Sequence, residues 1–272
     1  MKTTNRLSIV IFTMLMLFST SIFAQDDTKR PMYVVATTLH WNMDYDGDGD
    51  WKAIEKEYMD KVTKKNEHVM SGRFYTHLMT ENSTELMYVE TFANWDAIDK
   101  ASARDAELEK TAWPDEAKRG AFLKSRNAFY SRNHSDEIYA TMPGAKDMAA
   151  APTKDMILYL RRSHWAYPED GTTKEYMELS KEYQENVLMK NDYIKGYYPN
   201  RHFWGADATE FVEAFMLDSM DDLDDMLAKN GELFRAHWAD EDSRKEYWEK
   251  SSKYFTGVHG DYLYTMVHGI SE

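Results

Sequence analysis

The chain has no cysteine among its 272 residues. This absence excludes disulfides, thiolate metal sites and lipid attachment at a lipobox cysteine. A folded form must therefore rest on its hydrophobic core, for which 43% hydrophobic and 14% aromatic residues are ample. Units of more than about 70–80 residues can sustain such a core without crosslinks.

Basic residues are scarce beside acidic ones, with 33 Lys and Arg against 47 Asp and Glu, and the formal net charge is −14. It becomes −16 if Lys2 and Arg6 are removed with the N-terminal segment described next. Such a surface repels nucleic acid and anionic lipid, and the sequence shows no basic patch that would offset this. Nucleic-acid binding is therefore not expected.

Long apolar runs are also few, and the one at the N-terminus is typical of a signal peptide. Lys2 and Arg6 precede the mostly apolar stretch 7–18, and residues 21–24 (Ser-Ile-Phe-Ala) offer a cleavage site before Gln25. The run is shorter than the roughly 20 residues that a membrane span needs. We therefore predict a cleaved signal peptide over residues 1–24. The mature protein would be secreted or periplasmic, with no membrane insertion after cleavage.

The rest of the chain repeats its pattern at a shift of 125 residues. The apolar stripe Trp51, Ile54, Tyr58 and Val62 returns as Tyr176, Leu179, Tyr183 and Val187, with the spacing of an amphipathic helix. Near the end of each copy, His134, Asp136 and Tyr139 return as His259, Asp261 and Tyr264. The repeat predicts two units, 25–142 and 155–272, joined by a linker over 143–154 that is rich in Ala and contains Gly and Pro.

Each unit is predicted to have the order β-α-β-β-α-α-β, an α+β class. A β-branched or aromatic run opens it and the striped helix follows. The remaining elements are two strands, two helices and a closing strand. The predicted strands are 33–41, 72–80, 85–92 and 136–142 in the first unit, and 156–165, 196–204, 210–217 and 261–267 in the second. The paired helices are predicted over 95–113 and 116–130, and over 220–238 and 241–255.

This order resembles the ferredoxin-like unit of the dimeric α/β-barrel superfamily, with an extra helix before the last strand. The resemblance covers nearly all of the mature chain and rests on the pattern of elements. It implies two antiparallel sheets that pack face to face and enclose a pocket, here as an intrachain pair. Physical reasoning supports the pairing, because a sheet with helices on one side leaves its other face to be covered.

Six of the nine histidines occupy repeated places near strand ends. In a sheet of order 4-1-3-2, the ends of the first two strands and the start of the fourth lie at one edge, so the three histidines of a unit should gather there. A cluster of imidazoles beside a carboxylate suits acid–base catalysis, or a metal such as zinc. The alternative is that they cap strand ends. The candidate catalytic residues are His40, His77, His134, Asp136, His164, His202, His259 and Asp261.

One carboxylate lies inside the third strand of each unit, within a Val-Glu-x-Phe segment. A carboxylate on a central strand is paired, faces a wet pocket, or has a shifted pKa. We place both in the pocket wall, together with the repeated tyrosines, which would also suit a core position. The ligand-binding candidates are therefore Glu90, Glu213, Tyr139 and Tyr264.

An acidic loop in the first unit fits part of the EF-hand pattern. Its candidate calcium ligands are Asp44, Asp46, Asp48, Asp50 and Glu55, with Gly49 at the sharp turn. A strand rather than a helix precedes the loop, Lys52 occupies a usual ligand position, and the second unit lacks the acidic triad. The alternative is a solvated turn whose last Asp caps a helix.

These features predict a secreted protein that binds, and in the stronger form of the hypothesis transforms, a small organic molecule in a His/Tyr/Trp-lined barrel pocket. Whether it is an enzyme stays open. One alternative is a non-catalytic periplasmic or surface binding protein. The resemblance adds another, a haem-binding or monooxygenase-like protein, for which the dipeptide His237-Trp238 is a partial match. In the first unit, Ala112 occupies the position that corresponds to His237.

Overall fold

A computed structural model describes residues 30–271 of the chain. The predicted signal peptide, residues 1–24, lies outside this range and stays a prediction. Within the described range, no helix is both long enough and apolar enough to cross a bilayer.

The first half contains four strands and three α-helices with one short 3-10 turn. They are β1 (Tyr33–Trp41), α2 (Trp51–Lys61), η2 (Thr63–Lys65), β2 (Ser71–Met79), β3 (Glu85–Phe92), α3 (Trp95–Ala112), α4 (Glu116–Asn127) and β4 (Tyr130–Thr141). The helices begin where side chains cap them: Asp50, Asn94 and Asp115 each accept a backbone N–H from the first turn.

The second half follows the same order, with a π-turn where the first has η2. Its elements are β5 (Met156–Trp165), α5 (Thr173–Tyr183), η3 (Gln184–Leu188), β6 (Gly196–Trp204), β7 (Glu210–Leu217), α6 (Asp221–His237), α7 (Glu241–Ser252) and β8 (Phe255–Ser271). Thr172 caps α5, because its side chain accepts the backbone N–H of Glu175. The predicted linker contains only one isolated bridge, between Lys146 and Tyr197.

The closing strands are longer than predicted, and the helices before them are shorter. β4 begins at Tyr130 rather than at Asp136, and β8 spans Phe255–Ser271 rather than 261–267. Residues 131–135 are polar and carry no alternating apolar signal. They are strand because they pair with β1, whose Leu39 lies opposite His134 and whose Trp41 lies opposite Tyr130.

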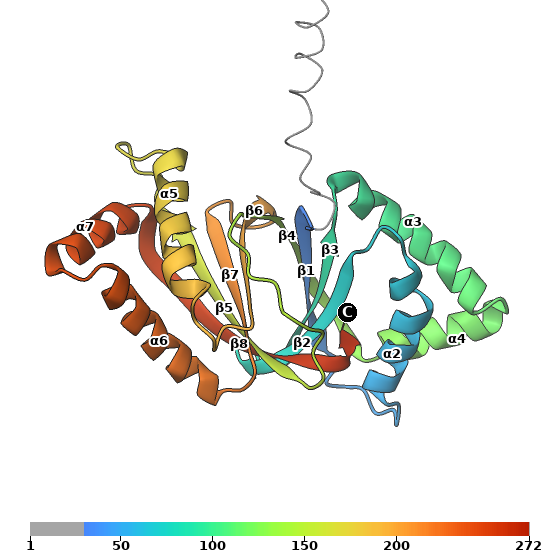
Figure 1. Cartoon of the computed structure of the whole chain (residues 1–272). Coiled ribbons are helices and arrows are strands. Elements are labelled where there is room, and N and C mark those ends of the chain that lie inside the picture. The colour runs from blue at the N-terminus through green and yellow to red at the C-terminus, as the bar shows by residue number, and fades with distance from the viewer. Residues whose placement is uncertain (1–29, 272) are drawn as a thin grey trace, which may run out of the picture.

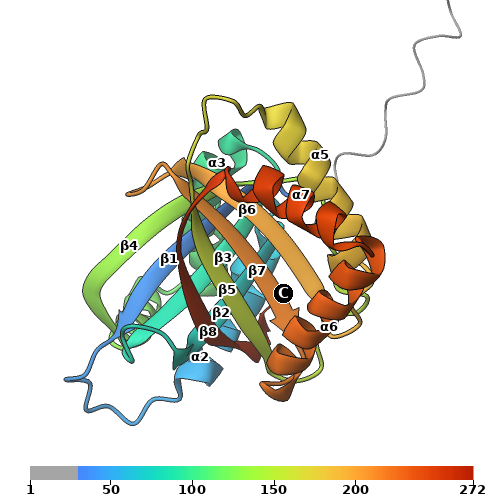
Figure 2. The ribbon, with the colours of Figure 1, turned by 90° about the vertical axis from the view of Figure 1, so that its left-hand side faces the viewer.

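The strands form one closed antiparallel barrel in the order β1-β3-β2-β8-β5-β7-β6-β4. Within the first half the order is β4-β1-β3-β2, and within the second it is β8-β5-β7-β6. The two sheets are joined at both edges, where β2 pairs with β8 and β4 pairs with β6. The expected face-to-face packing is thus incomplete, because backbone hydrogen bonds also join the sheets along two seams. Figure 2 shows β8 running past β5.

Helices α2, α3 and α4 cover one side of the barrel, and α5, α6 and α7 cover the other (Figure 1). Side chains alternate between the barrel interior and the layer under these helices. The interior is filled by the cluster Tyr75, Met87, Tyr139, Met156, Leu158, Leu160, Val212, Met216, Tyr264 and Met266. Separate apolar clusters lie between the barrel wall and each set of helices.

A buried ion pair joins α2 to α4 in the first half. The Arg126 Nε donates to both carboxylate oxygens of Glu55, at 3.0 and 2.9 Å, and the Glu55 side chain is only 1% exposed. The Tyr130 hydroxyl donates to the same carboxylate at 2.6 Å. The guanidinium also lies 3.7 Å from the centroid of the Tyr58 ring. The charge of Arg126 is therefore satisfied from two sides.

A second carboxyl, that of Glu90 on β3, lies in the same layer between the first-half sheet and its helices. The Tyr88 hydroxyl donates to it at 3.1 Å. Burial, with a smaller contribution from the nearby carboxyl of Asp105, raises the pKa of Glu90 to about 7, against the Tyr88 hydrogen bond and the charge of Arg126. Glu90 therefore carries a proton in the folded chain under mildly acidic conditions.

Replacing Glu55 by Gln should lower the free energy of unfolding by about 3 kcal/mol, because it leaves the charge of Arg126 buried without its partner. Urea denaturation measures this change. The matched control is Lys56→Gln, which removes an exposed ion pair with Asp60 and should cost less than about 1 kcal/mol. Equal losses in the two variants would contradict a structural role for the buried pair.

Replacing Glu90 by Gln should stabilise the fold at alkaline pH. The pKa of Glu90 is higher in the folded chain, at about 7, than its ordinary value of 4.5, so stability falls as pH rises through that interval. The Gln side chain does not ionise, so the variant keeps its stability as pH rises. Its free energy of unfolding should exceed that of the parent by up to about 3 kcal/mol at about pH 8, and match it near about pH 4. Urea denaturation across this range is the measurement, and the exposed Glu107→Gln is the control. A variant less stable than the parent at alkaline pH would refute the assignment.

Candidate functional site

The barrel wall separates the predicted histidine cluster into two groups. His134 lies opposite Leu39, so it shares the outer face of β1, while the neighbouring His40 points to the inner face with Val34 and Ala36. The sequence-based expectation that His40 and His134 lie together was therefore wrong. The register of β4 decides this, and that register depends on the unpredicted stretch of strand before Asp136.

The inner group contains His40, His77, His164 and His202, all near the end of the barrel where β1 and β5 finish. We call this the histidine end. His40 lies opposite Glu85, and His164 lies opposite Glu210. Each also meets a loop threonine: His40 Nδ1 is 3.3 Å from Thr84 Oγ1, and His164 Nδ1 is 3.1 Å from that of Thr209.

Two tyrosine–glutamate hydrogen bonds cross the seams inside the barrel. Tyr139 of the first half donates to Glu210 of the second at 2.7 Å, and Tyr264 of the second donates to Glu85 of the first. Burial raises the pKa of both tyrosines, and the accepting carboxylates raise it further. Both tyrosines are 5% exposed or less, so they act as interior hydrogen-bond donors rather than as walls of an open pocket.

Arg162 lies among these groups and was not predicted as a site residue. Its Nε is buried and has no hydrogen-bond partner in the described part of the chain. The guanidinium lies 5.3 Å from the Tyr262 ring. Burial lowers the pKa of Arg162, and the nearby Tyr139 and Glu210 raise it by more. In the first half the corresponding residue is Thr38, so the repeated pattern does not identify Arg162.

The outer group forms two His–Asp pairs. His134 Nε2 lies 3.7 Å from Asp136 Oδ2, and His259 Nε2 lies 3.3 Å from Asp261 Oδ2. All four side chains are about half exposed. Each pair shares a face as the two-residue period predicts, but neither pair meets the inner histidines.

The candidate calcium ligands do not come together as a site. Glu55 is turned into the buried ion pair with Arg126, and Asp50 caps α2 by accepting the amide of Ala53 at 3.1 Å. The helix begins at Trp51, which carries Glu55 away from the loop. Across residues 30–271, no group of three His, Cys, Asp or Glu side chains could hold a metal ion.

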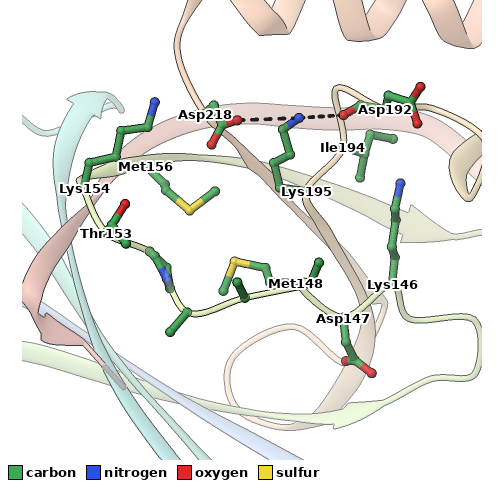
Figure 3. A pocket seen from close by; sticks show the side chains of 14 residues that line it. Lys146, Asp147, Met148, Thr153, Lys154, Met156, Asp192, Ile194, Lys195 and Asp218 are labelled. Carbon is green, nitrogen blue, oxygen red and sulfur yellow. Dashed lines mark hydrogen bonds and ion pairs between the residues drawn. The ribbon is translucent and has the colours of Figure 1, made fainter.

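The predicted linker arches over a hollow of about 370 Å³ (Figure 3). Two of its three lysines are already engaged. Lys195 reaches Asp218 at 3.5 Å and the Asp192 carbonyl at 2.8 Å, and Lys146 of the linker donates to the Asn191 carbonyl at 2.8 Å. The hollow contains none of the predicted site residues.

A larger cavity of about 570 Å³ lies in the second half, between the sheet and helices α5, α6 and α7. We call it the sheet–helix cavity. Aromatic rings and guanidinium groups predominate in its lining: Tyr159, Arg161, Tyr183, Leu188, Glu213, Phe215, Met226, Leu227, Asn230, Gly231, Phe234, Arg235, Arg244 and Trp248. Of the predicted ligand-binding residues, only Glu213 lies here.

Glu213 is the carboxylic acid among the residues that line this cavity. Burial raises its pKa, while the Tyr197 hydroxyl, which donates to it at 2.7 Å, and the charge of Arg161 lower it. Glu213 lies opposite Arg161 on β5, whereas Glu90 lies opposite Val35 on β1. The two Val-Glu-x-Phe segments are therefore not equivalent in the sheet, and Tyr88 occupies the place that matches Glu213.

Three guanidinium groups face the cavity from different elements, and the sequence analysis named none of them. Arg161 Nε lies 3.4 Å from Asp261, and Arg244 Nη1 donates to the Trp238 and Ala239 carbonyls at 2.9 and 2.7 Å. Arg235 makes no ion pair with a carboxylate of the described residues. Three guanidinium groups thus face at most two carboxylates, those of Asp261 and Glu213, so the lining carries a net positive charge.

Comparison with known proteins supports the architecture. No family model matches the sequence, and no curated protein does. Among solved structures, a monooxygenase-like protein from Lactobacillus acidophilus aligns with a TM-score of 0.54 at 10% identity, over 88% of this chain and 95% of that one.

Two further structures agree. A monooxygenase-like protein from Fusobacterium nucleatum gives a TM-score of 0.52 at 13% identity, covering 87% of this chain and 92% of its own. A chlorite dismutase-like protein gives 0.51 at 14% identity, covering 88% and 96%. At such identities the likeness concerns the fold. The chain therefore has the fold of the dimeric α/β-barrel superfamily, with all eight barrel strands in one polypeptide.

Proposed function

We propose that this protein binds a small, planar aromatic anion in the sheet–helix cavity of its second half. The observation that carries the proposal is the composition of that cavity, which combines three guanidinium groups, several aromatic rings and one carboxyl with a raised pKa. Pockets of this size, with an apolar lining and a few converging polar groups, are typical ligand sites.

The positive charge of the cavity lining favours an anionic ligand. Arg235 has no carboxylate partner among the described residues, and burial raises the pKa of the Glu213 carboxyl. An anion entering the cavity would therefore meet uncompensated positive charge. Guanidinium groups bind carboxylates and related oxyanions through paired N–H donors, which adds geometric selectivity to the attraction.

Ring stacking favours a flat ligand. Trp248 lines the cavity and is 58% exposed, so its ring is accessible to a bound molecule. The Phe234 ring lies 5.7 Å from it. Tyr183 adds a third ring to the lining, and burial raises its pKa to about 12, so the phenol stays neutral. A planar ligand would cover these rings.

Haem, which the sequence resemblance suggested, does not fit this donor set. It takes an axial ligand from His, Cys, Met or Tyr. No His or Cys lines the cavity, burial raises the pKa of the Tyr159 and Tyr183 phenols and so disfavours the phenolate, and Met226 is buried in the apolar cluster. His237 at the end of α6 has its Nε2 3.0 Å from Glu182 and its ring against Trp238. We therefore propose an organic anion rather than haem.

The stronger form of the proposal has Glu213 exchange a proton with the bound molecule. A carboxyl with a raised pKa in a cavity is suited to general acid–base chemistry, and Tyr197 holds its orientation. The non-catalytic alternative needs only the positive charge and the rings. Export of the mature chain stays a prediction in both forms.

We also propose that the halves are two ferredoxin-like units arising from duplication. Supporting this, Asn66 donates to the Ala101 carbonyl and to Asp105, while Asn191, which lies 125 positions later, donates to the Met226 carbonyl and to Asn230. A crystal structure should superpose the halves with Asn66 on Asn191. A superposition that needs another pairing of strands would contradict the duplication.

Replacing Arg235 by Gln should weaken the binding of 1-anilinonaphthalene-8-sulfonate, a fluorescent aromatic anion, by roughly tenfold or more, since a charged hydrogen bond contributes about 1.5–3 kcal/mol. Fluorescence titration gives the dissociation constant. Lys110→Gln, at the matching place of α3 in the first half, is the control and should leave it unchanged. Equal binding by the parent and Arg235→Gln would reject the cavity as the site.

The affinity for the same sulfonate should fall as pH rises, because ionised Glu213 repels an anion, and the probe itself stays ionised throughout. The decrease should be roughly tenfold if the coupling is about one pKa unit. In Glu213→Gln the affinity should not vary with pH, and Glu90→Gln should behave as the parent does. Calorimetry in buffers of different ionisation enthalpy should also show proton uptake on binding by the parent alone. Identical pH profiles in the parent and Glu213→Gln would exclude Glu213 from the site.

A further inference from the structure

A second cavity opens into the barrel itself, at the end opposite the histidines. Its volume is about 300 Å³, and it lies where β1, β2 and β6 begin and where the linker crosses the barrel. We call it the linker-end cavity. Residues of β1, β2, β3, β4, β6 and β7 line it, together with Met142, Ala145 and Asp147 of the linker side. It is thus separated by the barrel wall from the sheet–helix cavity.

The floor of the linker-end cavity is the apolar filling of the barrel. Val34, Val89 and Ala214 line the cavity and pack against the buried interior cluster. Tyr75, which is 6% exposed, belongs to that cluster and also lines the cavity. A ligand here would therefore rest an apolar body on the core of the barrel.

Arg73 supplies a positive charge inside the barrel. It shares the inner face of β2 with Tyr75 and lies opposite Val89 on β3. No carboxylate of residues 30–271 lies within ion-pair distance of it. The other arginine of the lining, Arg30, is at the rim, 60% exposed and 3.5 Å from Asp147. The guanidinium that could bind an acid within the barrel is therefore that of Arg73.

Asn200 has a buried hydrogen-bond acceptor that no donor of the described residues meets. It is 6% exposed, and its Nδ2 donates to the Tyr198 carbonyl at 2.9 Å. Its Oδ1 is buried and has no partner among the described residues. A buried acceptor left without a hydrogen bond costs about 1–3 kcal/mol, so a donor brought by a ligand would recover that energy.

We propose that the linker-end cavity binds a small carboxylic acid that also carries a hydroxyl or amino donor. Its carboxylate pairs with Arg73, its donor meets the Oδ1 of Asn200, and its apolar body lies on Val34, Val89 and Ala214. The volume of about 300 Å³ is at the lower limit for small-molecule sites, which suits one ring or a short chain. This site is independent of the proposed function, since no residue lines both cavities.

Three related probes test both polar contacts by isothermal titration calorimetry. The probe 4-hydroxyphenylacetate has a carboxylate and a donor, phenylacetate lacks the donor, and tyrosol lacks the carboxylate. The first should bind at millimolar concentration or better, and the other two should bind several-fold more weakly. Arg73→Gln should weaken the first probe roughly tenfold or more, because it removes a charged hydrogen bond. Asn200→Ala should abolish the difference between the first two probes.

Further variants separate this site from the other cavity and from a folding defect. Arg73→Lys keeps the charge and should retain most of the affinity for 4-hydroxyphenylacetate. Arg235→Gln should not change it, whatever that variant does to sulfonate binding. Circular dichroism and thermal denaturation establish that each variant is folded. Absence of heat with all three probes at millimolar concentration would overturn the proposal, as would equal binding by the parent and a folded Arg73→Gln. Loss of binding in Arg235→Gln but not in Arg73→Gln would assign the probe to the sheet–helix cavity instead.

Discussion

The structure depends on the closure of two sheet edges against each other. Each half by itself would leave two edge strands with unpaired backbone groups, and such edges invite aggregation. Here β4 pairs with β6 and β2 pairs with β8, so the backbone hydrogen bonds run around the whole barrel. Inside, Tyr139–Glu210 and Tyr264–Glu85 cross the same two seams. Closure therefore fixes how the halves sit and which side chains each contributes to the interior.

Closure also sorts the chemistry into separate compartments, because successive residues of a strand face opposite sides of the wall. The barrel interior has a histidine end with buried tyrosine–glutamate pairs and a linker end with Arg73. The layer under the helices holds Glu90 in one half and Glu213 in the other. Residues that are neighbours in sequence, such as Leu39 and His40, thereby serve different compartments.

The two halves use the layer between sheet and helices differently. In the first half, Glu55 and Arg126 form a buried ion pair in this layer. At a shift of 125 these positions are Ser180 and Ser251, so the second half lacks the pair. The second half has the sheet–helix cavity in this layer instead, with Arg161 where β1 has the uncharged Thr37. The same order of elements in the two halves thus does not require the same chemistry in both.

The sequence by itself determined the order of the elements and most of their limits, because apolar periodicity and caps such as Thr172 are local signals. It also singled out Glu213, since a carboxylate inside an apolar strand is unusual wherever that strand lies. Only the tertiary structure decided which face each histidine takes, because a strand's register depends on its partner, and β4 pairs through a polar stretch without a local signal. Arg161 and Arg235 escaped notice for the same physical reason. In the sequence they are typical of exposed charged residues. They form part of a site only because strands and helices that are distant in the sequence place them around one cavity.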